Sequence, residues 1–114
     1  MAVIRGEVWR ADLAPTRGTE QSGVRPVLVV QTDRANPNSP HTIVVPFTTR
    51  IRHKLLPSHV LVPAGEGGLS QDSVALCEQI RVADLGRLMT RSGLLSTQRM
   101  QEVDDALKVI LELP

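Results

Sequence analysis

The stretch that most constrains the fold runs from residue 23 to residue 31 and reads Gly-Val-Arg-Pro-Val-Leu-Val-Val-Gln. Its four consecutive aliphatic residues, 27–30, are rich in β-branched side chains and bounded by turn-forming residues, which predicts a buried strand. Pro26 disfavours helical geometry at Arg25 and favours an extended backbone there. A guanidinium group is therefore held where the chain enters its core. This stretch alone does not decide whether Arg25 is a surface residue or a ligand-binding one.

The length of 114 residues predicts a single domain over residues 1–114. A content of 41% hydrophobic and 22% charged residues is ordinary for a globular chain. No stretch approaches the roughly 18 apolar residues of a membrane span, and the N-terminus lacks a signal-peptide pattern. The single cysteine, Cys77, excludes an internal disulfide and has no metal-binding spacing. We therefore expect a reducing, cytoplasmic location without membrane contact.

Charge and aromatic content narrow the function classes. Residues 1–60 carry eight Lys and Arg against four Asp and Glu, whereas residues 61–114 carry five against eight. A basic N-terminal half fits an anionic partner such as nucleic acid. Trp9 and Phe47 are the only Trp, Tyr or Phe residues, so the chain can hardly build the aromatic platforms of polyproline-binding modules or OB-fold single-strand binders.

Hydrophobic alternation and turn residues predict five or six short strands, drawn from residues 6–13, 24–32, 42–45, 60–62, 72–81 and 88–93. Pro46 cannot donate in a central ladder, so we expect it to mark a bulge or a strand end just before Thr48. In the strand expected over residues 72–81, one face carries Val74, Leu76 and Ile80, and the other carries Ser73, Cys77 and Gln79.

The C-terminal segment is the clearest helix, and a single helical turn is expected over residues 83–87. Ser96 is the N-cap candidate, and Leu95 before it can pack against Met100. Apolar residues that recur at helical spacing are expected to face the core: Met100, Val103, Leu107 and Ile110. These elements together predict a mainly β chain with a C-terminal helix, arranged as a small, mostly antiparallel, barrel-like sheet.

Several kinds of chemistry find no support in the sequence. His41, His53 and His59 have no metal-ligand spacing, so no metal site is expected. His53 and His59 could form an acid–base pair for RNA cleavage, but they lie in polar connections that leave their geometry unconstrained, and a catalytic histidine is not expected. Cys77 is interpreted as a small apolar filler. The glycine-rich turn at 65–68 lacks the phosphate-binding loop pattern. What remains is a set of polar residues near strand ends: Glu20, Arg25, Thr48, Ser73 and Gln79.

The chain resembles the MazF/PemK family of bacterial toxins, which are endoribonucleases of toxin–antitoxin systems. The resemblance rests on short segments that follow one another in the family's order over nearly the whole chain. They are residues 5–9 (Arg-Gly-Glu-Val-Trp), Asp12-Leu13 and Pro15, 18–21 (Gly-Thr-Glu-Gln), 25–31 (Arg-Pro-Val-Leu-Val-Val-Gln), 45–48 (Val-Pro-Phe-Thr), 72–74 (Asp-Ser-Val), 78–81 (Glu-Gln-Ile-Arg) and the acidic, apolar C-terminal helix. Each segment is modest in specificity, but all of them in order form a strong signal.

The resemblance implies a small SH3-like barrel of the PemK/CcdB type that works as a homodimer. It also implies cleavage of single-stranded RNA without a metal or other cofactor, and neutralisation by a MazE-like antitoxin. Arg25 and Thr48 match the family's functional arginine and threonine, and Glu20 matches the glutamate of its first loop. Positions of the RNA-binding groove match Arg17, Gly18, Ser73, Glu78 and Gln79. The RNA sequence that is cut does not follow from the resemblance, because the first loop and the connection after Thr48 vary widely in the family.

The implied reaction is attack of the RNA's own 2′-hydroxyl on the adjacent phosphate, so DNA is not expected to be cut. Arg25 offers planar donors for phosphate oxygens, and Thr48 adds a hydroxyl donor. Because arginine stays protonated at neutral pH, it is a poor base, and Glu20 is expected to be either the base or a group that orients Arg25. Two alternatives stay open: a non-enzymatic, CcdB-like toxin that poisons DNA gyrase by binding it, and an RNA-binding module without chemistry.

Overall fold

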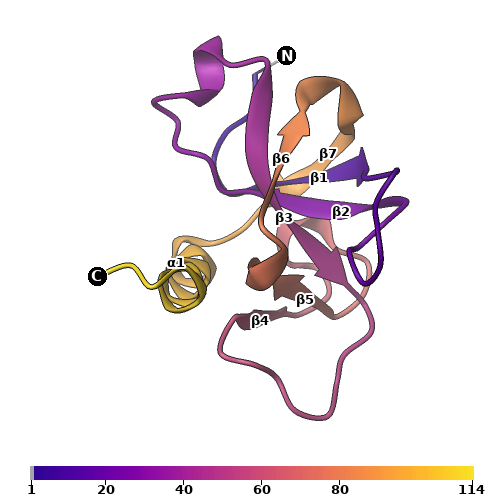
Figure 1. Ribbon diagram of the computed structural model, residues 1–114, viewed down its shortest axis with the longest axis vertical. Helices are drawn as coiled ribbons and strands as arrows, with labels where there is room; N and C mark the ends of the chain where they lie inside the picture. Colours follow the sequence, from indigo (N-terminus) through magenta and orange to yellow (C-terminus); the bar gives the residue numbers. More distant parts are fainter. Residues whose placement is uncertain (1) are drawn as a thin grey trace.

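The computed structural model describes residues 2–114, which form an antiparallel sheet of seven strands and one α-helix (Figure 1). The strands are β1 (Glu7–Asp12), β2 (Val24–Val29), β3 (His41–Thr48), β4 (His59–Val62), β5 (Ser73–Leu76), β6 (Arg81–Asp84) and β7 (Leu88–Leu94). The helix is α1 (Thr97–Leu111), and short 3₁₀ turns span Asn36–Asn38, Glu66–Gly68, Cys77–Gln79 and Leu85–Arg87. The strand order is β4-β5-β3-β2-β1-β7, with β6 also paired to β3. The predicted fold class, mainly β with a C-terminal helix, is confirmed.

Strand β3 connects the two halves of the sheet, because it pairs with three other strands. Residues 44–46 of β3 pair with β2, residues 41–44 pair with β6, and Phe47 and Thr48 pair with β5. The prediction that Pro46 ends or bulges the strand is wrong, since β3 continues to Thr48. The carbonyl of Ile43 accepts from Val30 of the β2 segment, so by alternation the nitrogen of Pro46 faces the opposite edge. At that edge of β3, neither β6 nor β5 pairs with residue 46. No strand acceptor therefore lacks a hydrogen bond because proline has no N–H.

The single strand expected over residues 72–81 is also wrong, because a 3₁₀ turn separates β5 from β6. Phe47 of β3 pairs with Ala75, whereas Val44 of the same strand pairs with Arg81. The two β3 residues are three positions apart, but their partners are six positions apart. Three extra residues, 77–79, are therefore accommodated in the turn. The helical turn expected over residues 83–87 spans only Leu85–Arg87, because β6 continues to Asp84.

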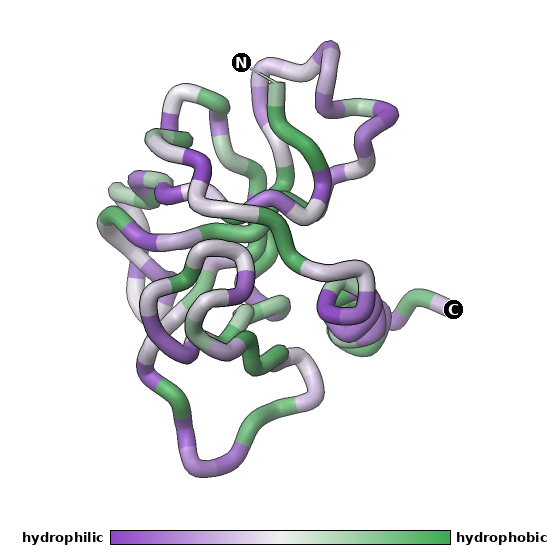
Figure 2. The backbone as a smooth tube through the Cα atoms, turned by 180° about the vertical axis from the view of Figure 1, so that it is seen from behind, coloured by the Kyte–Doolittle hydropathy of each residue, from purple (hydrophilic) through white to green (hydrophobic). Residues whose placement is uncertain are grey.

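The central strand β2 is buried on both faces, which explains its uninterrupted aliphatic run. Leu28 and Val30 belong to a core cluster that includes the buried side chains of α1, whereas Val27 and Val29 belong to a second cluster around Trp9. Figure 2 shows the hydrophobic segments meeting where the strands cross in the middle of the molecule. The predictions of a buried strand at 27–30 and of a core position for Trp9 are thereby confirmed.

Helix α1 begins and packs as its sequence predicts. The Oγ of Ser96 accepts a hydrogen bond from the N–H of Arg99 at 3.1 Å, and Leu95 and Met100 are both buried in the first core cluster. The buried face consists of Met100, Val103, Ala106 and Leu107. Ile110 was expected to belong to it but is 42% exposed, because it lies beyond the part of the helix that the sheet covers. No helix in the described residues, 2–114, is long and apolar enough to cross a membrane.

The glycine-rich turn at 65–68 has a packing role. A Cβ on Gly68 would lie 2.1 Å from the carbonyl oxygen of Ser92, and one on Gly93 would lie 2.5 Å from the carbonyl carbon of Gly67. Only glycine allows the backbone of this turn to approach β7 so closely. The turn therefore packs directly against the backbone of β7.

Glu7, on β1, is a buried carboxylate whose role the alternating pattern did not predict. Its side chain is 7% exposed and forms an ion pair with the Nε of Arg91 on β7. It also accepts hydrogen bonds from the backbone N–H of Ile4 at 2.7 Å and from the indole N–H of Trp9 at 3.2 Å. One carboxylate therefore joins the N-terminal segment, the second core cluster and strand β7.

We predict that Glu7→Ala lowers the free energy of unfolding by about 2 kcal/mol, because it leaves the buried indole N–H of Trp9 and the partly buried N–H of Ile4 without an acceptor. The measurement is urea denaturation followed by circular dichroism. The control is Asp105→Ala, because Asp105 is an exposed helix residue whose side chain accepts a hydrogen bond from Gln101 and no other within residues 2–114. Equal midpoints for the two variants would contradict this role for Glu7.

Candidate active site

One cleft contains most of the polar residues that the sequence singles out. It has a volume of about 940 Å³ and lies between the β1–β2 loop, the end of β3, the β3–β4 loop, strand β5 and the turn at 77–79. We call it the Arg25 cleft. Its lining residues are Thr19, Glu20, Gln21, Ser22, Arg25, Thr48, Thr49, Arg50, Arg52, Leu55, Leu56, His59, Val74, Leu76, Glu78 and Gln79. The β3–β4 loop that forms one wall projects at the bottom of Figure 1.

Arg25 is held in the cleft by three oxygen atoms. Its Nε donates to the carbonyl of Ser22 at 2.8 Å, and its Nη1 donates to the side-chain oxygen of Gln21 and to the carbonyl of Phe47 at 3.3 Å. None of these acceptors carries a formal charge, so the guanidinium keeps its full positive charge. Within the described residues, Nη2 has no hydrogen-bond partner and stays available to a ligand. This geometry suits an anion.

Gln79 supports this arrangement from the far side of the β1–β2 loop. Its side-chain oxygen accepts from the backbone N–H of Gln21 at 2.7 Å, and its amide nitrogen donates to the carbonyl of Thr19 at 3.3 Å. The polar atoms of the Gln79 side chain thus hold the loop that supplies Gln21, which in turn orients Arg25. The chain of contacts runs from Gln79 through Gln21 to Arg25.

Thr48 reaches the same cleft from the last position of β3. Its Oγ1 accepts a hydrogen bond from the N–H of Arg50 at 3.1 Å. A hydroxyl group has one proton to donate and two acceptor sites, so the Thr48 proton is available to a ligand oxygen. Arg50 and Arg52, from the loop that follows, add two further cations to the lining of the cleft.

Glu78 adds a negative charge to the lining of the cleft. Its Oε1 accepts from the hydroxyl of Ser58 at 3.0 Å, and its Oε2 lies 2.9 Å from Nε2 of His59. The Nδ1 of His59 accepts from the N–H of Leu56 at 3.2 Å, which places the imidazole proton on Nε2, where it is donated to Glu78. The His59 ring is 7% exposed, whereas the Glu78 side chain is 30% exposed.

The structure brings together five of the eight predicted site residues, namely Glu20, Arg25, Thr48, Glu78 and Gln79. Arg17 and Gly18 are exposed in the same loop but do not line the cleft. Ser73 is 2% exposed, donates to the carbonyl of Gln71 at 2.9 Å and lies outside the cleft lining. By strand alternation it points away from the side of β5 that carries Val74 and Leu76, so we propose no ligand contact for it.

The orienting role expected for Glu20 falls to its neighbour Gln21. Glu20 lines the cleft, but its Oε1 accepts from the backbone N–H of Arg17 at 3.2 Å, and among the described residues it makes no hydrogen bond to Arg25. Gln21 and His59 are the site residues that sequence reasoning missed. The segment Gly18-Thr19-Glu20-Gln21, which carries part of the family resemblance, is a signal for Gln21, but nothing local in the sequence connects His59 with Glu78.

No group of three or more His, Cys, Asp or Glu residues in the described part of the chain is placed to hold a metal ion. Burial, with a smaller contribution from the Glu78 carboxylate, raises the pKa of the Cys77 thiol to about 12. Cys77 is therefore a protonated, buried core residue, as predicted.

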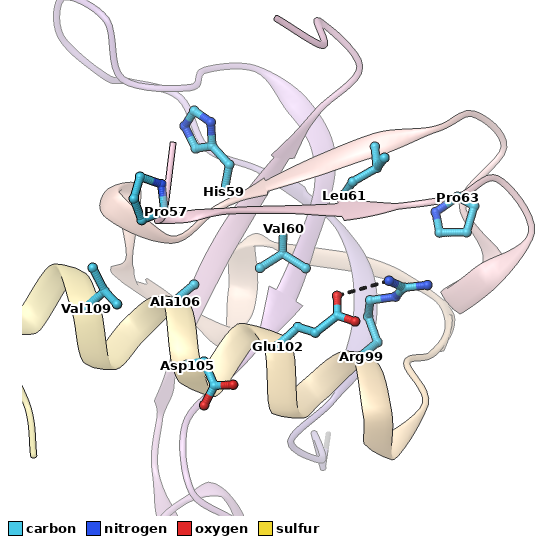
Figure 3. A pocket seen from close by; sticks show the side chains of 10 residues that line it. All are labelled: Pro57, His59, Val60, Leu61, Pro63, Arg99, Glu102, Asp105, Ala106 and Val109. Atoms are coloured by element: carbon cyan, nitrogen blue, oxygen red, sulfur yellow. Dashed lines mark hydrogen bonds and ion pairs between the residues drawn. The ribbon is translucent and has the colours of Figure 1, made fainter. Parts of the chain in front are cut away.

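A second hollow lies on the other side of β4, between this strand and α1 (Figure 3). We call it the β4–α1 groove; its volume is about 610 Å³ and its lining includes Val60, Ala106 and Val109. Figure 3 shows Val60 pointing toward the helix and His59 at one end of the strand. His59 lines both hollows, so β4 forms the wall between them.

The chain is similar to known proteins over nearly its whole length. The chain is 47% identical over 113 residues to Endoribonuclease EndoA of Bacillus subtilis (strain 168), covering 99% of this chain and 97% of that protein. It is similar to the crystal structure of MazF from Deinococcus radiodurans, with a TM-score of 0.83, 26% identity and 98% of each chain covered. It is also similar to a mycobacterial endoribonuclease in complex with its cognate antitoxin, with a TM-score of 0.82, 26% identity and coverage of 99% and 98%.

A family model covers nearly the whole chain. It matches residues 4–111, which include every strand and all of α1. The matched segment therefore contains the complete Arg25 cleft and the residues that hold it. The chain belongs to the family of PemK-like, MazF-like toxins of type II toxin–antitoxin systems.

Proposed function

We propose that this toxin is a sequence-selective endoribonuclease that cleaves single-stranded RNA in the Arg25 cleft without a metal ion. Cleavage of messenger RNA in the cytoplasm would stop translation and growth until a cognate antitoxin blocks the cleft. The observation that carries the proposal is the placement of Arg25, whose guanidinium is fixed by three uncharged oxygens beside the free hydroxyl proton of Thr48. The name of the Bacillus relative supports it.

The proposed reaction uses a nucleophile that the substrate itself supplies. The 2′-oxygen of one ribose forms a bond to the adjacent phosphorus while the bond from phosphorus to the 5′-oxygen breaks, which leaves a 2′,3′-cyclic phosphate and a 5′-hydroxyl. The 2′-oxygen loses its proton to a base, and the leaving 5′-oxygen gains one. Arg25 and Thr48 donate hydrogen bonds to the phosphate oxygens, where negative charge accumulates in the transition state.

The base is assigned to Glu20 as part of the proposal. It is the carboxylate of the β1–β2 loop and lines the cleft with Arg25, and it is exposed, so a backbone hydrogen bond to Arg17 still leaves it accessible to a ribose hydroxyl. Arg25 is unsuited to this step because arginine retains its proton far above neutral pH. The guanidinium is accordingly assigned to charge stabilisation alone.

The proposed partners follow from charge and exposed surface. An acidic antitoxin segment would fit the cations of the cleft, Arg25, Arg50 and Arg52, in place of RNA. A neighbouring structure is an endoribonuclease bound to its cognate antitoxin, which supports this partner. A homodimer is supported by large apolar side chains that are exposed on β4 and α1, Leu61, Val109, Ile110 and Leu111, since a second copy would remove them from water.

An RNA oligonucleotide with a single 2′-deoxy substitution at the cut site is predicted to resist cleavage, because the nucleophile is missing. The measurement is gel analysis of the products in the presence of EDTA, with the unmodified oligonucleotide as the control. Cleavage of the substituted site at an unchanged rate would exclude attack by the 2′-hydroxyl.

The same assay separates the alternatives. Arg25→Ala and Thr48→Ala are each predicted to reduce the rate on the order of 10²- to 10³-fold, as expected for loss of one donor to a developing oxyanion. Intact RNA with the wild-type protein, with or without Mg²⁺, would instead favour a CcdB-like toxin that acts by binding gyrase. Binding without cleavage would favour a module that has no chemistry.

Gln21 provides a test of how Arg25 is positioned. Gln21→Ala is predicted to lower kcat about tenfold with a smaller change in KM, because Arg25 loses one of the acceptors that orient it. Gln21→Glu keeps an acceptor of the same shape but neutralises the guanidinium, so it is predicted to raise KM for RNA.

The matched control is Gln98→Ala, because Gln98 is exposed on α1. Steady-state kinetics of the three variants on one oligonucleotide give the comparison. Gln21→Ala kinetics equal to those of Gln98→Ala would show that Ser22 and Phe47 are sufficient to orient Arg25.

A further inference from the structure

The two loops that border the Arg25 cleft have few hydrogen bonds to the rest of the protein. Within residues 2–114, residues 16–21 of the β1–β2 loop are bonded to other parts of the chain only through Gln79 and Arg25. In the β3–β4 loop of the described chain, no hydrogen bond involves residues 51–55. Segments with so few contacts open easily. The few contacts that they do make therefore decide how firmly their side chains are held in the cleft.

Gln79 is the anchor of the β1–β2 loop. Its side-chain oxygen accepts from the N–H of Gln21 at 2.7 Å, and its amide nitrogen donates to the carbonyl of Thr19 at 3.3 Å. The root of the loop is fixed separately, because the guanidinium of Arg87 donates to the carbonyl of Ala14. Loss of the Gln79 side chain would therefore release the tip of the loop, which carries Gln21, and leave its root in place.

Glu78 is the anchor of the β3–β4 loop. Its Oε1 accepts from the hydroxyl of Ser58 at 3.0 Å, and its Oε2 accepts from Nε2 of His59 at 2.9 Å. His59 in turn accepts from the N–H of Leu56 at 3.2 Å, and the N–H of Cys77 donates to the carbonyl of Ser58 at 3.1 Å. One carboxylate thus fixes the end of the loop, both directly and through the imidazole ring.

The turn that carries both anchors is itself fixed in the core. Cys77 is fully buried in the first core cluster, and Ile80 packs against that cluster. The N–H of Ile80 donates to the carbonyl of Cys77 at 3.3 Å and closes the turn. Because its base is buried, the turn can hold two loops in a constant relation to each other.

We propose that the turn at 77–79 positions both loops of the Arg25 cleft and that Glu78 and Gln79 are positioning residues of the nuclease. All four polar side-chain atoms of these two residues bond to the loops or to the first residue of β4. The effect on catalysis rests on the proposed endoribonuclease function, whereas the anchoring of the loops does not.

The proposed consequence is a fixed spacing of the cations in the cleft. Gln79 acts on Arg25 through Gln21, which accepts a hydrogen bond from the guanidinium. Glu78 acts on the loop that supplies the two other arginines of the lining. The two residues are therefore expected to affect different kinetic constants, because Arg25 is assigned to the transition state and the other arginines to the RNA backbone.

The first test is amide hydrogen exchange, measured by NMR on the protein alone. Gln79→Ala is expected to speed exchange of the Gln21 N–H about tenfold and to leave the Leu56 N–H unchanged, since only one loop is released. Glu78→Ala is expected to give the opposite pattern. Glu78→Gln can still form a hydrogen bond with each of its two partners, so it is expected to exchange like the wild-type protein.

The second test is steady-state kinetics on one RNA oligonucleotide. Gln79→Ala is expected to lower kcat about 3- to 10-fold with a smaller change in KM, because Arg25 is less well oriented. Glu78→Ala is expected to have a KM about 2- to 10-fold above that of Glu78→Gln, which removes the same charge but keeps the anchor. Gln98→Ala is the matched control, because Gln98 is exposed on α1.

The substituted side chains lie outside the core, since Glu78 is exposed and Gln79 is half-buried, and thermal unfolding verifies that each variant is folded. Unchanged exchange of Gln21 in Gln79→Ala, or of Leu56 in Glu78→Ala, would overturn the inference even if these variants cleave RNA slowly. Changed exchange with kinetics equal to those of the control would overturn the positioning role. Absence of cleavage by the wild-type protein on any RNA would instead overturn the proposed function, while the exchange measurements would still decide whether the turn anchors the loops.

Discussion

The change of pairing partners along β3 is the constraint on which the rest of the structure depends. Strand β3 pairs with β2 over residues 44–46, with β6 over residues 41–44 and with β5 over residues 47–48. Because β6 and β5 meet β3 in registers that differ by three residues, the chain between them must form the turn at 77–79. That turn places Glu78 and Gln79 together in the Arg25 cleft, whereas a regular strand would point them to opposite faces. The end of β3 delivers Thr48 to the same place.

The cleft combines this geometry with three arginine side chains, Arg25, Arg50 and Arg52. Its cations come from the start of β2 and from the loop after β3, and each can serve the phosphate backbone. Arg25 differs from Arg50 and Arg52 in being anchored by three acceptors that do not neutralise it. A fixed, unneutralised guanidinium loses little entropy when it binds phosphate, which is what electrostatic stabilisation of a transition state requires.

The sequence predicted the elements that depend on local physics. The aliphatic run at 27–30, the core position of Trp9 and the Ser96 cap of α1 all follow from short-range patterns, and the structure confirms them. The predictions at Pro46 and over residues 72–81 were wrong for one reason. Both depend on which strands pair with β3, and pairing between distant segments leaves no trace in local alternation.

The site was predictable to the extent that the family resemblance named it. Arg25, Thr48, Glu78 and Gln79 line one cleft as the resemblance implied, but Ser73 is turned into the interior. His59 and Glu78 are 19 positions apart in the chain and meet because β4 pairs with β5. The sequence pattern around His59 predicts no role for it in the site. Long-range register, rather than residue type, decides which polar groups reach the cleft.

The proposed chemistry depends above all on binding of the scissile phosphate by Arg25 and Thr48. A crystal structure of the protein with an RNA oligonucleotide carrying a 2′-deoxyribose at the cut site tests it most directly. We expect phosphate oxygens about 2.7–2.9 Å from Nη2 of Arg25 and within hydrogen-bond distance of Oγ1 of Thr48. An oligonucleotide bound along the β4–α1 groove, with Arg25 still bonded only to Gln21, Ser22 and Phe47, would contradict it.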